Sequence, residues 1–446
     1  MLDLWWTELR QVKAHLRALF PHPSVAASAA AFLDGLLGPE RRKTGWMRAE
    51  AAGDPGPWRQ QAVLGRSHGD ADALRDLVRE DAIETLASPD AGLVIDETGF
   101  LKQGQSSCGG GRPYTGSAGK ITHCQIGVLA AYVSDKGCAF IDRPLDLPQD
   151  WTTKPERRPA AHGPDALRFA PKPQRAAQMI ERAMAAGVPF DGAATDTVSG
   201  VGALEMPLRR AGKGSGLGAH ATDPFTSWGK TRPVAGTAEP IARALASQAW
   251  RRLSAGDGTK GPRLDDGASV ELADLEAEED SPEPTGLWTR GLLIRRTITD
   301  QDLAFFSPWC PAGTLMETLV RVQGHRWAIE DAFETAQTER GLTHNETRSW
   351  HGWHRHGSLV MLAFAMMAVV RPHAHRLTSP QKEPTRAGCS AGLLVCPGHP
   401  PGRHTPRPAP DRACLRDRLV RVATSASGGG ASLTSQASHR KRKLQL

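Results

Sequence analysis

The chain has 446 residues, 39% of them hydrophobic, which is enough for two or three domains and at least one sizeable core. Its net charge of +7 is uneven, because residues 371–446 carry 14 Lys and Arg against 3 Asp and Glu. This charge fits a polyanionic partner such as DNA, although a solvated tail explains it equally well.

The cysteines and the apolar stretches indicate where in the cell the protein is expected. The seven cysteines include no CxxC pair, which argues against a zinc ribbon or a disulfide framework and favours a reducing cytoplasm. The first residues do not have the basic and then apolar order of a signal peptide. The most apolar stretch, residues 359–370, is too short to cross a bilayer, so we expect no membrane association.

The first half of the chain changes from helical to strand-like periodicity. Residues 1–90 have helical spacing of apolar residues, with one helix at about 72–86, and we interpret them as an N-terminal helical region. Apolar runs at 92–95, 124–133 and 138–141 predict three strands. A helix over 171–186 and a short segment at 188–196 follow. Three linked strands and then a crossover helix predict a mixed α/β sheet.

The second half divides into an insertion, a return to the core and a tail. Residues 222–285 are rich in Gly, Ala and Pro and include nine Asp and Glu between 265 and 283, a pattern typical of a solvated surface. Strands are predicted at 287–299 and 303–309, and a long helix at 313–340. We therefore expect a core in two parts, residues 91–221 and 311–377, separated by an insertion lobe with its return strands at 222–310. Residues 378–446 are expected to be a low-complexity basic tail without a packed core.

Three acidic residues stand out by position. Asp96 follows the first strand, Asp196 ends the segment 188–196, and Glu330 shares one face of the long helix with Arg326 and Gln337. Carboxylates gathered in this way form an all-oxygen site that suits Mg²⁺ or Mn²⁺. Two such ions, about 3.5–4 Å apart, support displacement at phosphorus. Because the chain has 48 Asp and Glu, strand-end caps and a solvated helix residue also explain the three positions.

Four blocks, in order along the chain, carry a family resemblance. They read LVIDETGFLKQG (93–104), RPYTGSAGKITHCQIGVLAAYVS (112–134), GVPFDGAATD (187–196) and HRWAIEDAFETAQTERGLTHNETRSWHGWHRH (325–356). Together they resemble the DDE-type transposases of bacterial insertion sequences, in the branch whose third motif follows a Tyr-Arg-Glu-Lys pattern. The resemblance extends from the N-terminal helices to about residue 375.

The resemblance implies a fold, an activity and partners. The fold is an α/β, RNase H-like mixed sheet flanked by helices, with a strand-rich insertion. The catalytic and metal-binding carboxylates are Asp96, Asp196 and Glu330, holding Mg²⁺ or Mn²⁺. The activity is that of an endonuclease that cuts element ends and joins the 3′-hydroxyls to target DNA. The implied partners are terminal inverted repeats, target DNA and a second copy of the chain.

Several positions depart from the family pattern. Gln337 stands where the family has Lys, Gln323 where it has Tyr, Ser199 where a Tyr is usual, and Asn345 where an aromatic residue is expected. Gln337, Ser199 and the low-complexity tail favour one alternative, a remnant that binds DNA without cutting it, whereas the three carboxylates oppose it. A nuclease on the same fold that cuts without joining is a further alternative.

DNA contacts are expected from the third motif and the helix that follows it. The predicted contact residues are Arg326, Gln337, Arg348, Arg355 and His356. A zinc site among the histidines of residues 348–356 lacks partners at a recognisable spacing.

Overall fold

A computed structural model describes residues 2–378, apart from 68, 154–156, 165–167, 197–200, 229, 231–232, 259–260 and 277–286. The predicted tail from residue 379 onward and Ser199 lie outside the described residues. No described helix combines the length and the apolar character that crossing a membrane requires.

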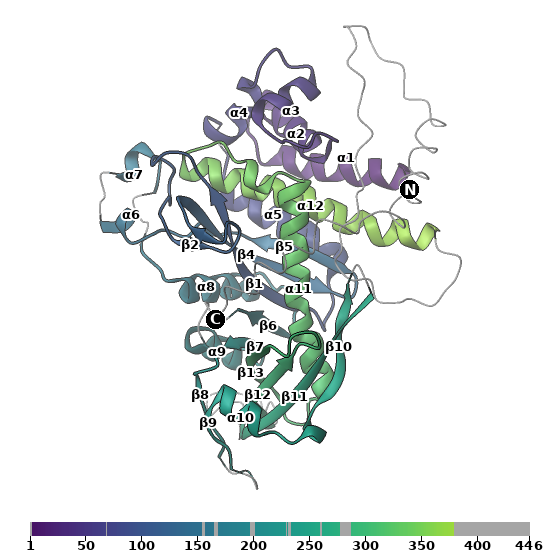
Figure 1. Ribbon diagram of the computed structural model, residues 1–446. Helices are drawn as coiled ribbons and strands as arrows, with labels where there is room; N and C mark the ends of the chain where they lie inside the picture. Colours follow the sequence, from purple (N-terminus) through teal and green to yellow (C-terminus); the bar gives the residue numbers. More distant parts are fainter. Residues whose placement is uncertain are drawn as a thin grey trace.

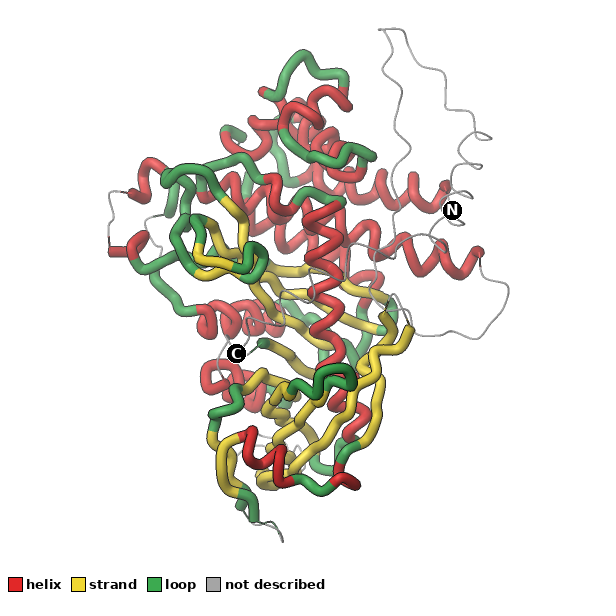
Figure 2. The backbone as a smooth tube through the Cα atoms, viewed as in Figure 1, coloured by secondary structure: helices red, strands yellow, loops and turns green. Residues whose placement is uncertain are grey.

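One nine-stranded mixed sheet organises the molecule (Figure 2). Its strand order is β10-β11-β12-β13-β7-β6-β1-β4-β5, in which β1, β6 and β7 are parallel and the other pairs antiparallel. The strands of this sheet are β1 (Gly92–Leu101), β4 (Cys124–Ser134), β5 (Gly137–Asp142), β6 (Gly192–Thr195), β7 (Gly214–Ala219), β10 (Arg251–Gly258), β11 (Gly261–Glu276), β12 (Leu287–Arg296) and β13 (Leu303–Pro311). Two small ribbons pair β2 (Tyr114–Thr115) with β3 (Lys120–Ile121), and β8 (Pro224–Thr226) with β9 (Ala235–Thr237).

Helices precede the sheet and flank it (Figure 1). Five of them, predicted by the helical spacing of residues 1–90, are α1 (Leu2–Ala18), α2 (Pro23–Leu37), α3 (Gly45–Ala52), α4 (Trp58–Gly65) and α5 (Ala71–Leu86). The others are α6 (Asp150–Thr153), α7 (Arg157–Ala160), α8 (Lys172–Ala185), α9 (Val201–Arg210), α10 (Ala238–Ala244), α11 (Met316–Thr338) and α12 (Trp350–Thr378), with 3₁₀ turns η2 (Ser247–Ala249) and η3 (Leu342–His344). This mixed α/β sheet with flanking helices confirms the predicted fold class and is consistent with an RNase H-like fold.

The first strand is longer than the sequence predicted. β1 pairs with β4 along its whole length, and Asp96 lies opposite Leu129, so the carboxylate is in mid-strand and the prediction that the strand ends before it is wrong. On its other side β1 pairs with β6 only over Gly92–Ile95. Asp96 therefore stands where the β6 neighbour stops, and Asp196 directly follows the end of β6.

The predicted insertion adds strands to the core sheet. Four of the nine strands, β10–β13, come from residues 251–311, and β13 pairs with β7 of the core. The sequence analysis missed β7 and α9, because Gly214–Ala219 is glycine-rich and has no alternating apolar pattern. The core strands and the inserted strands thus form one continuous sheet (Figure 1).

The N-terminal helices are joined to the segment that follows α11. The backbone N–H groups of Lys43 and Gly45 donate to the His344 ring and the Glu346 carboxylate, each at 2.9 Å. The buried guanidinium of Arg340 donates to the carbonyl of Leu36 at 3.3 Å. These contacts fix the position of the N-terminal helices relative to the end of α11.

The aromatic side chain of Phe140 is the basis of a stability prediction. It is 1% exposed, and its ring centroid lies 5.3 Å from that of Phe333 and 5.2 Å from that of Phe364. Phe140→Ala should lower the free energy of unfolding by about 3–5 kcal/mol, because it leaves a cavity between β5, α11 and α12. Urea unfolding measures this loss. Phe169→Ala, at a site that is 47% exposed, is the control and should cost under about 0.5 kcal/mol; equal losses would contradict the assigned packing.

Candidate active site

Helix α11 lies along β1 and is fixed to it on both sides of Asp96. Near the start of the strand, a Cβ on Gly92 would lie 2.7 Å from the His325 ring, so only glycine permits this close approach. Further along, the Gln337 side-chain amide donates to the Thr98 hydroxyl at 2.7 Å. The stretch of α11 between these contacts contains Arg326 and Glu330, which are thereby brought to the middle of β1.

The carboxyl of Asp96 is the electrostatic centre of this arrangement. It is partly buried, and one of its oxygens accepts a hydrogen bond from the Glu97 backbone N–H at 2.7 Å. Burial is the largest cause that raises the pKa of Asp96, and the Asp196 carboxylate and, more weakly, the Glu330 carboxylate act in the same direction, so that the pKa is about 7. Arg326 opposes the shift. The other predicted residues, Asp196, Glu330 and Arg326, therefore lie near enough to Asp96 to affect its pKa.

The residues present fit a divalent cation. Asp196, Glu330 and Arg326 all affect the pKa of Asp96, and after burial the Asp196 carboxylate has a larger effect than Arg326. Hard cations with oxygen ligands, such as Mg²⁺ or Mn²⁺, suit this set of side chains. In the described part of the chain, no three His, Cys, Asp or Glu side chains stand close enough together to hold one ion, so the fit to a cation rests on the types of these residues and not on a formed cluster.

Glu97 belongs to the opposite face of the sheet. Successive residues of a strand point to opposite sides, and Thr98 faces α11 together with Asp96. The Glu97 carboxylate instead lies 2.5 Å from the Lys172 ammonium at the start of α8. It is therefore an ion-pair partner of α8 on the face of the sheet away from α11, where burial first and, more weakly, the Asp196 carboxylate raise its pKa.

The inserted strands contact α11 beside Glu330. The Arg263 guanidinium of β11 donates to the Asp331 carboxylate at 2.8 Å. Arg263 and Arg295 both lie over the Trp327 ring, at 5.1 and 5.6 Å from its centroid. At Gly324, a Cβ would lie only 1.9 Å from the Ala255 carbonyl of β10. We call Arg263, Trp327 and Asp331 the α11 brace, because they fix the helix turn that carries Glu330.

The predicted DNA contacts fall into two groups. Arg348 is exposed and Arg326 is partly exposed, so both are accessible to a ligand. Arg355 and His356 are 7% and 1% exposed. The Arg355 guanidinium donates to the carbonyls of Leu64 and Gly69, and the His356 ring contacts backbone carbonyls of residues 341 and 342. Their predicted place at a DNA surface is therefore corrected, because both side chains are used in packing.

Sequence reasoning missed several residues that position the site. Thr98 follows Asp96 by two residues, so the two-residue period of a strand could have placed it on the same face. His325 is adjacent to the predicted Arg326, yet its contact with Gly92 needs the three-dimensional register. Arg263 has no sequence signal, since it lies 68 positions from its partner Asp331.

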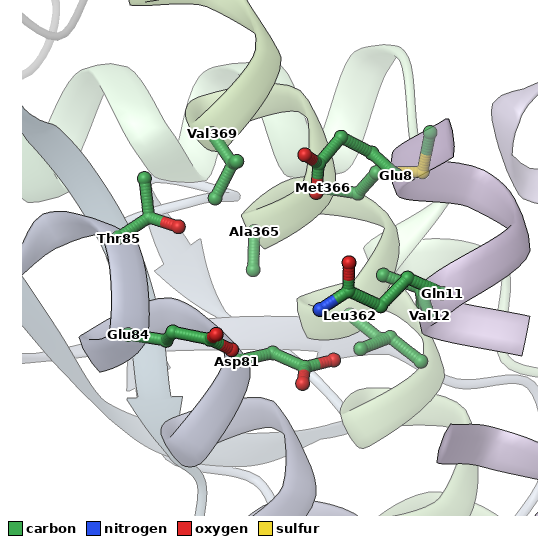
Figure 3. Close-up of a pocket in the computed structure, with 10 residues that line it drawn as sticks. All are labelled: Glu8, Gln11, Val12, Asp81, Glu84, Thr85, Leu362, Ala365, Met366 and Val369. Carbon is green, nitrogen blue, oxygen red and sulfur yellow. The ribbon is translucent and has the colours of Figure 1, made fainter. Parts of the chain in front are cut away.

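A hollow between α1, α5 and α12 lies apart from these carboxylates (Figure 3). Its floor is formed by apolar residues of α12, and the acidic side chains around it are Glu8, Asp81 and Glu84. Burial raises the pKa of Asp81, which lies 2.8 Å from the His15 ring. None of the predicted site residues lines this hollow.

The charge of Asp96 predicts a pH-dependent stability. The folded-state pKa of Asp96, about 7, lies above the ordinary value of 3.8. The stability that the protonated carboxyl gives to the folded protein is therefore fully present below about pH 4 and is lost as pH rises through 7. Asp96→Asn should therefore stabilise the metal-free protein at pH 8.5, on the order of 2–4 kcal/mol, and much less at pH 5. Urea unfolding in a chelator at both pH values measures the difference; an effect independent of pH would contradict the raised pKa.

The α11 brace predicts a coupling energy between Arg263 and Asp331. Each side chain is 24% exposed, so the ion pair with its aromatic contact should contribute about 1 kcal/mol to the free energy of unfolding. Arg263→Asp should accelerate amide hydrogen exchange in α11 but leave exchange in α5 unchanged. The charge-swapped double variant, Arg263→Asp with Asp331→Arg, should recover part of the protection. Additive effects of the two substitutions would contradict a direct pair.

Comparison with known proteins finds one family whose model matches part of the chain. Residues 15–197 match the family model described as DDE superfamily endonuclease, and no curated protein matches the chain. The matched segment contains Asp96 and Asp196 and ends before α11, which carries Glu330. Nucleases of this family generally use divalent metal ions and act on DNA. The match confirms, at the level of the DDE superfamily endonucleases, the resemblance to DDE-type transposases that the sequence motifs predicted.

Proposed function

We propose that the chain is a DNA transposase that cuts the ends of its element and joins the freed 3′-hydroxyls to target DNA. The observation that carries this proposal is that the Asp196 and Glu330 carboxylates raise the pKa of Asp96, although the three residues come from the end of β6, α11 and β1 respectively. The match of residues 15–197 to a DDE superfamily endonuclease supports nuclease chemistry. The joining step, the insertion-sequence origin and the Tyr-Arg-Glu-Lys branch are finer parts of the proposal.

Asp96, Asp196 and Glu330 would hold the divalent cations. When bound, a pair of Mg²⁺ or Mn²⁺ ions supplies a stronger nucleophile and stabilises the leaving oxygen at phosphorus. Asp96 is well suited to this role, because the residues of β1 before and after it are all paired with β4. This pairing holds the carboxylate rigidly. Arg326 is a cation that lowers the pKa of Asp96. We assign its guanidinium to a phosphate next to the scissile bond.

The proposed reaction has two displacements at phosphorus. In the first, water attacks the phosphodiester at the element end, the bond to the 3′ oxygen breaks, and a 3′-hydroxyl is released. In the second, this hydroxyl attacks a target phosphodiester, so that one phosphodiester forms as another breaks. The fixed register of α11 on β1 keeps Glu330 beside Asp96 through both steps.

Other parts of the chain are assigned to DNA. Arg348 is exposed in the segment between α11 and α12, and we assign it to the DNA backbone. The N-terminal helices would bind the terminal inverted repeats, and the basic residues 371–446 would add salt-dependent affinity. The active form with both element ends would be a homodimer in the bacterial cytoplasm. Gln337 is assigned to positioning α11, since its amide is bonded to Thr98.

A cleavage assay tests this function. The substrate is a plasmid that contains the coding sequence with its natural flanking DNA, incubated with Mn²⁺ and the purified full chain. Wild type should nick at the element ends and transfer them to a second plasmid. Asp96→Ala should lower both rates by a factor of at least about 10³, as expected when a ligand of the reacting centre is lost.

Two neighbouring carboxylates are matched controls. Glu97→Gln lies next to Asp96 but faces Lys172, and Glu334→Gln lies one turn beyond Glu330 on the exposed side of α11. Both should keep at least about a third of wild-type activity, because neither is among the charges that shift Asp96. Nicking without transfer would favour the nuclease alternative. DNA binding with no metal-dependent cutting by wild type would favour the non-catalytic alternative.

A further inference from the structure

We propose that Trp46 and Trp58 contact bases of the terminal repeat, and this inference rests on the proposed function. The two side chains come from α3 and α4 of the N-terminal helical region. We define the tryptophan surface as Trp46, Met47 and Trp58, with Arg41 and Arg42 next to it in the chain. Figure 1 shows α3 and α4 beside α2, at the end of the molecule opposite the inserted strands.

The two tryptophan rings are exposed next to each other. Trp46 and Trp58 are 61% and 62% exposed, and their ring centroids lie 6.5 Å apart at an interplanar angle of 58°. Met47, which follows Trp46 in α3, is also exposed. Tryptophan is well buried in most folded chains, and a group of large apolar side chains at the surface marks a contact site. A partner is therefore expected to cover the tryptophan surface.

The packing of α3 and α4 holds both rings outward. The Trp58 ring lies on the turn between the two helices, where a Cβ on Gly56 would come within 2.0 Å of it. On the side of α3 away from Trp46, the buried Arg48 guanidinium lies 3.9 Å from the centroid of the Phe32 ring of α2. Both helices pack against α2. Side chains fixed in this way before a partner arrives lose little freedom on binding, which favours a contact.

The electrostatic potential at the start of α3 is positive. The two arginines of the tryptophan surface are exposed just before α3 begins. The ring of His344 accepts a hydrogen bond from the backbone N–H of Lys43, so it lies at the same place. The pKa of His344 is lowered first by burial and then by three cations, Arg42, Arg48 and Lys43. Each of these cations has a larger effect than the opposing Glu346 carboxylate.

Area and charge favour a nucleic acid over a protein at the tryptophan surface. Two tryptophan rings that are 61% and 62% exposed offer about 200–300 Å², well below the roughly 800 Å² per partner of a stable protein interface. Residues 41–66 carry six Lys and Arg against two Asp and Glu, of which Asp54 is bonded to Arg59. Two copies of the chain that met here would bring like charges together. DNA instead offers apolar bases and sugars between phosphates.

The tryptophan surface lies within reach of a DNA end held at the candidate site. Gly341, which follows α11, packs so closely on Lys43 that a Cβ would lie 2.5 Å from the Lys43 side chain. From Glu330 to the end of α11 is about 12 Å of helix, and three residues then lead to Gly341. Trp46 follows Lys43 by three residues. These lengths limit the separation of Glu330 and Trp46 to about 40 Å, the length of about 12 base pairs.

DNA binding by the full chain tests the inference. Asp96→Asn protein, which keeps the fold but loses a site carboxylate, is titrated into duplexes that tile the natural flanking DNA. In this background, Trp46→Ser with Trp58→Ser should weaken binding to the end-containing duplex by about tenfold or more, the range expected for loss of base contacts. Binding to an unrelated duplex should weaken by less than about twofold, because phosphate contacts remain. Trp46→Phe with Trp58→Phe keeps aromatic rings and should retain end binding within about threefold.

The salt dependence of binding separates the two kinds of contact. Arg41→Gln with Arg42→Gln should reduce the slope of log affinity against log salt concentration by about 2, as expected when two phosphate contacts are lost. The Trp46→Ser, Trp58→Ser variant should keep the slope of its parent. An unchanged slope in the arginine variant would contradict the assignment of these cations to phosphates.

Tryptophan emission gives a second measurement that does not depend on the serine variant. The end-containing duplex should quench the emission of the Asp96→Asn protein more than that of the same protein with Trp46→Phe and Trp58→Phe. The difference should disappear with an unrelated duplex. Equal quenching of both proteins by the end-containing duplex would overturn a contact between these rings and DNA.

The matched control is Trp6→Ser, which removes an exposed tryptophan from α1 and should leave DNA affinity unchanged. Unchanged end binding in the Trp46→Ser, Trp58→Ser variant, or an equal loss in Trp6→Ser, would overturn the tryptophan surface. A changed oligomeric state of the DNA-free variant in sedimentation velocity would assign the two rings to a second copy of the chain and would also overturn it. In these cases cutting by wild type still supports the proposed function. Failure of wild type and Asp96→Asn to bind any duplex would overturn both.

Discussion

The register of α11 on β1 is the constraint on which the candidate site depends. Two contacts set it, namely the approach of His325 to Gly92 and the hydrogen bond from Gln337 to Thr98. Asp96 lies between them, and Glu330 lies between the corresponding helix residues. A shift of α11 by one turn would move Glu330 by about 5.4 Å and separate it from the other two carboxylates.

The inserted strands give this register its second support. β10–β13 continue the core sheet beyond β7, so α11 contacts both the core strand β1 and the edge strand β10. The α11 brace then ties the turn next to Glu330 to β11. In this arrangement the insertion helps to build the site, and a substitution in residues 251–296 can disturb a carboxylate that is distant in sequence. The N-terminal helices are likewise hydrogen-bonded to the segment after α11, which connects the region that we assign to DNA ends with α11.

Much of this could be predicted from the sequence where local pattern decides the structure. Apolar runs predicted β4 and β5, and helical spacing predicted α5 and α8. Motif order predicted one site of Asp96, Asp196 and Glu330, of which the last two affect the pKa of Asp96. The end of β1 was predicted too early, because Asp96 and Glu97 look like a strand end although β4 pairs with both. Burial of Arg355 and His356 could not be predicted, since cationic residues usually lie at the surface and only the N-terminal segment supplies the carbonyls of Leu64 and Gly69 that Arg355 needs. The α11 brace depends on contacts between distant strands and has no local pattern.

The central claim is that the carboxylates of β1, β6 and α11 form one cation site. Its most direct test is electron paramagnetic resonance of Mn²⁺ bound to the full chain, titrated at pH 8, where Asp96 is largely ionised. The account predicts that wild type binds Mn²⁺ stoichiometrically and that Glu97→Gln binds it with unchanged affinity. Mn²⁺ binding should be lost or at least about tenfold weaker in each of Asp96→Asn, Asp196→Asn and Glu330→Gln. Equal Mn²⁺ affinity in wild type and all three site variants would contradict it.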